Sequence, residues 1–288
     1  RRTDRSICSA GRKSRIFGID WAYFTNASVN EEGRIMSDKI TVSNDGPVRI
    51  ITINRPALRN ALDNEAARSL TDALQNFDED ENSKVAVLTG AGGSFCAGAD
   101  LKEIAADGAV YESWAGANGP NGRLLSKPII AAIAGHACAG GLGIALRCDI
   151  RIADSTAVFG VFSRRFGVPM SDGTTVRLPR LIGAGYAQDM LITGRPVEAE
   201  EALRIGLITR LIPSGSVLDS AISLAKQITT VPQTALNSDR RSAYEQAGLP
   251  LNDAFAQEIA LAEKAKTADA QTGAEQFAAG AGRHGDKK

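Results

Sequence analysis

The sequence predicts an α/β fold, a spiral of repeated strand–strand–helix units followed by a helical C-terminal segment. Three observations support it. Short apolar runs with strand character alternate with helical patterns between residues 40 and 230. These runs lack the long parallel crossover pattern of a doubly wound sheet. From about Thr234 to Phe277 the chain is rich in Ala, Glu, Lys and Gln and has no strand signal, so this part is expected to be helical.

The predicted core begins with a β-hairpin. Ile40–Val42 and Val48–Ile53 flank Asn44-Asp45-Gly46, a strong hairpin turn signal. Pro56 ends the second strand, because proline has no N–H group to donate to a sheet.

A helix follows the hairpin. Asp63 is suited to cap its first turn, and it is expected to run to about Phe77 with its apolar residues on one face. Further apolar strands are predicted over Val85–Thr89, Pro128–Ala134, Asp149–Ala153 and Val158–Gly160. The uncharged run Ile129–Leu146 is interpreted as a strand, a glycine loop and a buried helix, not as a membrane span, because it contains four glycines and a histidine.

The chain is divided into three parts. Residues 1–35 are basic and precede the first methionine, Met36, so they are expected to be an appendage outside the fold: upstream read-through, a tag or a transit-like segment. Residues 36–230 are expected to form the core, and residues 231–288 a helical oligomerisation segment. A cytoplasmic location is expected, with an organelle matrix as the alternative if residues 1–35 are a transit peptide.

Composition argues against several functions. Lys and Arg number 33 and Asp and Glu also number 33, so the basic excess typical of nucleic-acid binders is absent from the sequence. The four cysteines show no zinc-type spacing and are expected to be reduced thiols. With only two histidines, His136 and His284, no metal site is expected. No phosphate-loop, dinucleotide or serine-hydrolase motif is complete, so no cofactor is expected either.

Two glycine-rich turns, within Gly90–Lys102 and Gly135–Cys148, are the strongest candidates for a functional site. Both follow buried strands and consist largely of small residues, which let a ligand touch the backbone. Free N–H groups at helix starts attract anionic oxygen, and two that converge would form an oxyanion hole. The alternative is that the glycines only permit close packing.

In order along the chain, several motifs resemble the enoyl-CoA hydratase/isomerase (crotonase) superfamily, over roughly Ile40 to Gly282. They are Ile53-Asn54-Arg55-Pro56, Arg59-Asn60-Ala61-Leu62, Phe95-Cys96-Ala97-Gly98-Ala99-Asp100-Leu101-Lys102, Ala139-Gly140-Gly141, Cys148-Asp149-Ile150-Arg151-Ile152-Ala153, Arg177-Leu178-Pro179-Arg180-Leu181-Ile182-Gly183, Thr193-Gly194-Arg195 and Ala199–Gly206.

The resemblance implies a crotonase-like spiral that binds an acyl-CoA thioester, with coenzyme A part of the substrate. It implies that Ala99 and Gly140 supply the oxyanion N–H groups. Arg59 and Lys102 are implied to meet CoA phosphates, for which a cation is apt. The CoA path is implied to be lined by Ala61, Ala97, Asp100 and Leu101. It also implies trimers or hexamers, with residues near Phe277 reaching a neighbouring subunit, and no nucleic-acid or membrane partner.

The resemblance also marks a departure. Hydratases of this family use two glutamates for proton transfer, and alignment on the motifs places Gly143 and Ser163 at those positions. Asp172 is the candidate replacement, because an aspartate in an apolar pocket can act as an acid or base. Its alternative role is an N-cap for the helix that begins near Gly173. Ser163 could position a water or a substrate hydroxyl. Arg164 and Arg165 could bind a carboxylated acyl group, although a surface ion pair is the commoner role.

Three functions remain open. The first is an acyl-CoA enzyme, hydratase-like, or an isomerase or decarboxylase that uses Asp172. The second is a non-catalytic acyl-CoA binder. The third is a purely structural role, which would not explain the presence of the CoA-contact residues.

Overall fold

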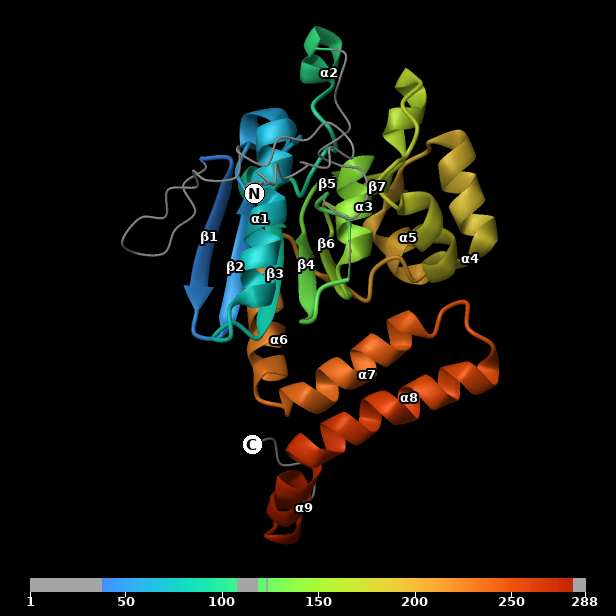
Figure 1. Ribbon diagram of the computed structural model, residues 1–288. Helices are drawn as coiled ribbons and strands as arrows, with labels where there is room; N and C mark the ends of the chain where they lie inside the picture. Colours follow the sequence, from blue (N-terminus) through green and yellow to red (C-terminus); the bar gives the residue numbers. More distant parts are fainter. Residues whose placement is uncertain (1–37, 108–118, 123, 282–288) are drawn as a thin grey trace, which may run out of the picture.

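The computed structural model describes residues 38–107, 119–122 and 124–281. The predicted appendage, residues 1–35, lies outside the described residues, as do Cys8 and His284. Two sheets and their covering helices form the main body, and a pair of long helices lies beside it (Figure 1).

The hairpin and the first helix form as predicted. Strands β1 (Ile40–Asp45) and β2 (Val48–Ile53) pair antiparallel across the turn at Gly46. Helix α1 (Asn64–Glu79) begins at Asp63, whose side chain accepts a hydrogen bond from the backbone N–H of Ala66 at 2.8 Å. This satisfies one of the donors that every helix start leaves unpaired.

The larger sheet continues in parallel from β2. Its order is β1-β2-β3-β4-β6-β9, with β3 at Val85–Gly90, β4 at Ile129–Ile133, β6 at Ile150–Asp154 and β9 at Arg210–Ile212. The central strands β3 and β4 are buried on both faces because their side chains alternate between two cores, whereas the edge strand β1 exposes Thr41 and Ser43. In β3, Ala86 and Leu88 pack on the α1 side, whereas Val85 and Val87 pack against α6 (Val217–Thr229). Burial on both faces explains why the strands read as continuous apolar runs.

A smaller sheet carries the second glycine-rich turn. Strands β5 (His136–Cys138), β7 (Val158–Gly160) and β8 (Val197–Glu198) form it, and α3 (Gly140–Arg147) starts directly after β5. The predicted strand and helix over 129–146 are therefore β4 and α3, and the predicted loop between them contains the short strand β5, which was not predicted. Within the described ranges, no helix is long and apolar enough to cross a membrane.

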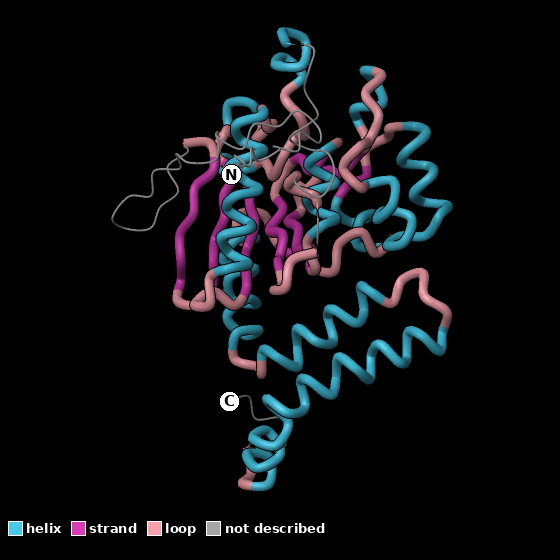
Figure 2. The backbone as a smooth tube through the Cα atoms, viewed as in Figure 1, coloured by secondary structure: helices cyan, strands magenta, loops and turns pink. Residues whose placement is uncertain are grey.

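The remaining elements follow the smaller sheet and then leave the body. The 3-10 segment Phe162–Phe166, α4 (Thr174–Thr193) and α5 (Ala199–Arg204) precede the last strand. After α6, helices α7 (Gln233–Glu245) and α8 (Leu251–Ala265) run antiparallel to each other, a π-helical turn spans Lys266–Ala270, and α9 (Gln271–Ala278) follows (Figure 2). This is the helical C-terminal segment predicted from composition.

Candidate active site

The two glycine-rich turns lie against each other. Cys96 is tied to β5 by two backbone hydrogen bonds: its N–H donates to the carbonyl of His136 at 2.8 Å, and its carbonyl accepts from Cys138 at 3.0 Å. Leu62 supports the other side of the first turn, donating to the carbonyl of Gly98 and accepting from the N–H of Asp100. The first turn is thus held between the chain before α1 and the strand before α3.

Glycine is required where the turns touch. A Cβ atom on Gly98 would lie 2.9 Å from the backbone nitrogen of Gly140, and the φ angle of Gly98 is +100°, which L side chains rarely adopt. A Cβ on Gly141 would overlap the carbonyl oxygen of Cys96. These glycines therefore do permit close packing, and the packing brings the start of α3 onto the first turn.

Two backbone N–H groups remain available at this contact. Neither Ala99 nor Gly140 donates a hydrogen bond to any part of the chain that the structure describes. Ala139, which precedes α3, has φ +49° and ψ −123°, an unusual conformation for a residue with a side chain. Strained backbone of this kind is concentrated at functional sites.

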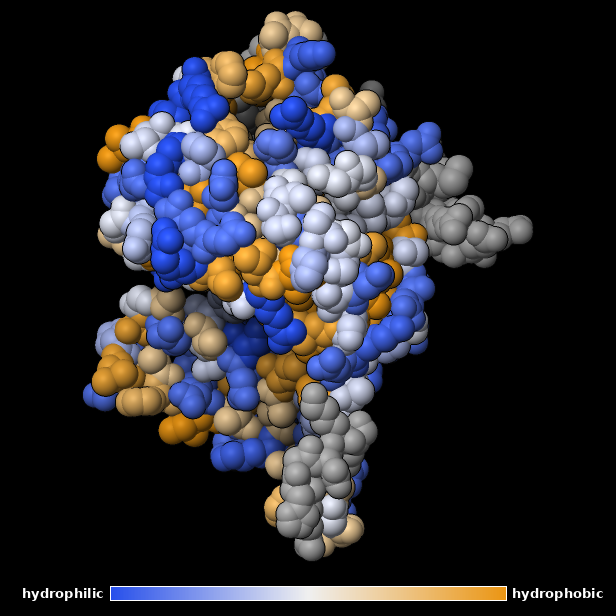
Figure 3. All heavy atoms as spheres, turned by 180° about the vertical axis from the view of Figure 1, so that it is seen from behind, coloured by the Kyte–Doolittle hydropathy of each residue, from blue (hydrophilic) through white to orange (hydrophobic). Residues whose placement is uncertain are grey.

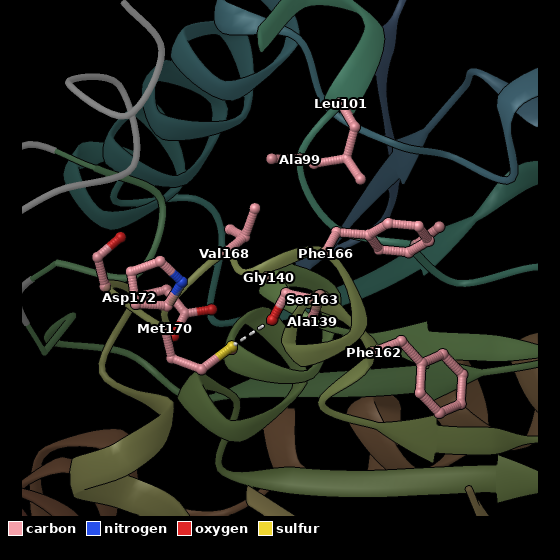
Figure 4. A pocket seen from close by; sticks show the side chains of 13 residues that line it. Ala99, Leu101, Ala139, Gly140, Phe162, Ser163, Phe166, Val168, Met170 and Asp172 are labelled. Carbon is pink, nitrogen blue, oxygen red and sulfur yellow. Dashed lines mark hydrogen bonds between the residues drawn. The ribbon is translucent and has the colours of Figure 1, made fainter. Parts of the chain in front are cut away.

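Ala99 and Gly140 both line a cavity of about 110 Å³ whose walls are mostly apolar. Its other lining residues include Leu101 from α2 (Leu101–Asp107) and Met170. Figure 4 shows Asp172 on one side of the cavity, with Phe162 and Phe166 on the other. The full lining is Ala97, Ala99, Leu101, Ala139, Gly140, Phe162, Ser163, Phe166, Val168, Pro169, Met170, Ser171 and Asp172.

Asp172 is the titratable residue among those that line this cavity, and only 6% of it is exposed. Its Oδ1 accepts a hydrogen bond from the backbone N–H of Thr174 at 3.0 Å, at the start of α4. Its Oδ2 is buried and accepts no hydrogen bond from the described residues. Burial raises the pKa of this carboxyl above its ordinary value, although the N–H of Thr174 and the nearby Arg177 act in the opposite direction.

The neighbouring polar residues have structural partners. The hydroxyl of Ser163 lies 3.2 Å from the sulfur of Met170, as the dashed line in Figure 4 shows. Arg164 donates to the carbonyl of Leu191, and Arg165 donates to that of Gly194. Among the described residues neither arginine forms the surface ion pair named as the alternative: both donate to carbonyl groups near the end of α4, and Arg165 also lies over the ring of Phe162 at 4.3 Å. Neither arginine lines the cavity.

The residues predicted to meet CoA divide into two groups. Ala97 and Leu101 line the cavity, whereas Arg59, Ala61, Asp100 and Lys102 lie outside it. The carboxylate of Asp100 pairs with Arg55 at 3.1 Å and accepts from the N–H of Lys102 at the start of α2.

The histidine and the three cysteines of the described residues do not line the cavity. Burial, with the positive charge of Arg59 as a lesser cause, lowers the pKa of His136, which does not line the cavity. Cys96, Cys138 and Cys148 are buried free thiols, and burial raises the pKa of each to about 12. The described residues contain no cluster of His, Cys, Asp and Glu that could hold a metal ion.

A second, larger cavity of about 930 Å³ lies between the core and α7. It shares Ser171 and Asp172 with the first cavity. Figure 3 shows the indentation from behind, bordered by both hydrophilic and hydrophobic side chains. Arg240 of α7 crosses it and pairs with Asp149 of the core at 2.7 Å.

Sequence reasoning missed several lining residues. Ala139, Phe162, Phe166, Val168 and Met170 were not among the predicted site residues. The segment 162–172 has neither a strand nor a helix period, so only its closeness to the predicted Ser163 and Asp172 pointed to it.

Comparison with known proteins shows the family of the chain. The family model described as enoyl-CoA hydratase/isomerase matches residues 44–281. The enoyl-CoA hydratase EchA19 of Mycobacterium tuberculosis is 39% identical over 221 residues, which cover 74% of this chain and 83% of that protein. The short-chain-enoyl-CoA hydratase of Clostridium acetobutylicum is 34% identical over 210 residues, covering 71% and 80%. The carnitinyl-CoA dehydratase of Salmonella enteritidis is 32% identical over 225 residues, covering 76% and 85%.

Solved structures confirm the predicted spiral fold. The enoyl-CoA hydratase EchA1 from Mycobacterium marinum superposes with a TM-score of 0.79 at 36% identity, covering 84% of this chain and 96% of that one. An enoyl-CoA hydratase from Mycobacterium tuberculosis H37Rv gives the same TM-score, identity and coverage. The motifs, the fold and these similarities lead to one conclusion: the chain belongs to the enoyl-CoA hydratase/isomerase family, within the crotonase superfamily.

Proposed function

We propose that this protein is an acyl-CoA enzyme that stabilises a thioester enolate and transfers a proton at the carbon next to the thioester carbonyl. The observation that carries the proposal is the cavity shared by the unpaired N–H groups of Ala99 and Gly140 and the carboxyl of Asp172. Two preorganised donors stabilise the negative charge that develops on a carbonyl oxygen, and each such donor is typically worth about 10²–10³ in rate.

Asp172 supplies the proton chemistry in this proposal. A carboxyl whose pKa is raised above its ordinary value is a stronger base, and it holds a proton at higher pH than an ordinary aspartate does, which suits transfer to and from an α-carbon. One carboxyl group can remove a proton from one carbon and return it to another, as in isomerisation. It can also deliver to the α-carbon the proton that water loses on addition to the β-carbon. Hydration, isomerisation and decarboxylation all pass through the same stabilised enolate.

The cavity is sized for the acyl end of the substrate. About 110 Å³ is below the range of pockets that enclose whole drug-sized ligands, so the CoA portion must lie outside it. Arg59, exposed and outside the cavity, and Lys102, exposed on α2, are the proposed contacts for CoA phosphates. We propose that the path from the cavity to these phosphate contacts is bordered by the backbones of Ala61, Ala97 and Leu101 and by the neighbouring Asp100.

A panel of substrates tests the proposal. Purified protein is assayed with short and long 2-enoyl-CoAs for hydration, with 3-enoyl-CoAs for isomerisation and with malonyl-type CoAs for decarboxylation, and CoA binding is measured separately. We expect turnover of at least one class and a loss of about 10²–10⁴-fold in Asp172→Asn. CoA binding without turnover of any class would overturn the enzyme assignment.

A non-catalytic acyl-CoA binder is the second candidate. The observation that favours it is the hydrogen bond from Thr174 to Asp172 Oδ1, which gives the aspartate a structural role at the start of α4. If this candidate is correct, Asp172→Asn binds CoA thioesters as wild type does, and neither protein turns them over.

Self-association is part of the proposal. Leu251, Phe255 and Ile259 recur at four-residue intervals on α8 and are 69%, 54% and 61% exposed. Such an apolar stripe is stabilised when a second copy of the chain covers it. We propose a homotrimer or homohexamer in which Phe277, also exposed, reaches toward a neighbouring subunit.

A further inference from the structure

The space above Gly143 is filled by a side chain from another element. Gly143 lies in α3, three residues after Gly140, and is fully buried in the core. A Cβ built on Gly143 would overlap Oδ2 of Asp172, would lie 2.6 Å from its Cγ and would lie 3.0 Å from Oγ1 of Thr174. The three atoms nearest to that Cβ thus all belong to the segment that begins α4.

This contact differs from the other glycine contacts of the site. Gly98 and Gly141 press against backbone atoms, so their side chains are excluded by the path of the chain itself. Gly143 faces the end of a side chain, which can rotate away. Glycine also weakens a helix interior relative to alanine, and the backbone geometry of an ordinary helix gives no reason for it here. The carboxylate of Asp172, which lies over position 143, explains why a glycine stands there.

We propose that Gly143 is a positioning residue for Asp172. The missing side chain at position 143 leaves a space at the first turns of α3, and the carboxylate of Asp172 occupies it. Gly143 follows Gly140 by three residues, ~4.5 Å along the axis of α3, so the carboxylate over Gly143 lies at the same end of the helix as the proposed oxyanion donor. Gly140 and Asp172 line the same cavity, and the proposal has the substrate carbonyl oxygen at Gly140 with its α-carbon turned toward the carboxylate. The inference rests on the proposed role of Asp172 in proton transfer.

The two residues therefore form one functional unit. The carboxylate of Asp172 can keep its present place only while position 143 has no side chain. Burial of this carboxylate raises its pKa. A carboxylate displaced toward solvent would therefore have a pKa closer to the ordinary aspartate value.

Four proteins test the unit: wild type, Gly143→Ala, Asp172→Asn and the double variant. Gly185→Ala is the matched control, because it makes the same change in exposed helical backbone with no atom within 4 Å of the new Cβ. We expect Gly143→Ala to lower kcat at least 10-fold and to shift the acidic limb of its pH profile to lower pH. The dissociation constant for CoA and the activity of Gly185→Ala should be unchanged. The double variant should be no slower than Asp172→Asn alone, because the methyl group acts only through the carboxylate.

A crystal structure of Gly143→Ala gives a readout that does not depend on turnover. The proposal predicts α3 in place and the Asp172 carboxylate rotated out of its present position. A shifted helix with the carboxylate unmoved would overturn it, as would wild-type kcat and pH profile in Gly143→Ala, or additive losses in the double variant. Full activity of Asp172→Asn would instead refute the proposed function, and the crystal structure would still decide the positioning.

Discussion

Asp172 lies where α4 begins and where the cavity ends, so its two oxygens have different surroundings. Oδ1 accepts a hydrogen bond from the N–H of Thr174, whereas Oδ2 lies over Gly143, with Oγ1 of Thr174 on the same side, and accepts no hydrogen bond from the described residues. The two alternatives for this residue, a helix cap and an acid or base, therefore do not compete for the same atom. One oxygen fixes the side chain, and the other is the one to which we assign the proposed proton transfer.

The pH dependence of stability tests the state of this carboxyl. Because burial raises the pKa of Asp172, the folded protein holds a proton at pH values where the unfolded chain has lost it. The resulting contribution to stability is fully present below the ordinary aspartate pKa and is lost as pH rises through the higher folded pKa. Asp172→Asn keeps the acceptor for Thr174 and carries no charge, so we expect it to lack this loss and to be more stable than wild type at neutral pH.

Chemical denaturation of both proteins across the acidic and neutral range measures this difference. A variant that is less stable than wild type at neutral pH would contradict a buried carboxyl with a raised pKa.

Single residues could be predicted from sequence where their partners are local. The cap by Asp63 was found because its acceptor and the N–H of Ala66 are three residues apart. The contact between Gly143 and Asp172 joins positions 29 residues apart and follows from how α3 and α4 pack, which no local pattern contains. For the same reason the carbonyl partners of Arg164 and Arg165 were missed.

At the scale of elements, the site depends on the contact between two turns. The first turn is braced by Leu62 and β5, and the second begins α3 behind the strained Ala139. Gly98 lies directly against the backbone nitrogen of Gly140, so we expect it to influence the spacing of the two proposed N–H donors.

Gly98→Ala is expected to separate the turns. The new methyl group would press on the backbone nitrogen of Gly140, and the φ angle of +100° disfavours any side chain. We expect a loss of about 10²–10³ in kcat, the value of one oxyanion donor, measured by steady-state kinetics. Wild-type kcat in a folded Gly98→Ala protein would contradict the assignment of the donors.

Elements were predictable where turn chemistry or burial is strong. Asn44-Asp45-Gly46 gave the hairpin, and the apolar runs gave β3, β4 and β6 within a few residues. The division into two sheets was not foreseen, because short strands such as β8 at Val197–Glu198 are defined by their partners and not by a pattern of their own.

At the scale of the whole molecule, α7 is fastened to the core by Arg240. Its guanidinium pairs with Asp149 at 2.7 Å and donates to the carbonyl of Leu125 at 2.7 Å, and its side chain is only 10% exposed. Asp149 in turn accepts from the N–H of Ile129 at the start of β4. The helical pair is thereby connected to the central sheet.

Arg240→Met should weaken this attachment. Removing one partner of a largely buried ion pair leaves the other charge uncompensated, so we expect a loss of about 3 kcal/mol in the free energy of unfolding. Arg241→Met is the matched control, because Arg241 forms a solvent-exposed pair with Glu245, and its loss should leave the free energy of unfolding nearly unchanged. Both free energies of unfolding are measured by urea denaturation. Equal losses in the two variants would contradict the claim that the buried Arg240–Asp149 pair stabilises the fold more than an exposed pair does.

The exposed stripe of α8 gives a prediction for assembly. Phe255→Glu combined with Ile259→Glu places charge on the stripe and should dissociate the proposed oligomer, as measured by light scattering after gel filtration. Ala260→Glu adds a charge on a different face of the same helix and should leave the mass unchanged. A wild-type protein that is monomeric at micromolar concentration would contradict self-association.

The central claim, that Ala99, Gly140 and Asp172 together form and reprotonate an enolate, is tested most directly by hydrogen exchange at the α-carbon of a bound acyl-CoA. A short saturated acyl-CoA is incubated with the protein in heavy water, and deuterium at the α-carbon is followed by NMR. This measurement depends on enolate formation and not on which product the natural substrate gives. We predict exchange with wild type and a loss of about 10²-fold or more in Asp172→Asn, with binding of the acyl-CoA retained in both. Binding without exchange in wild type, or equal exchange in Asp172→Asn, would contradict the account.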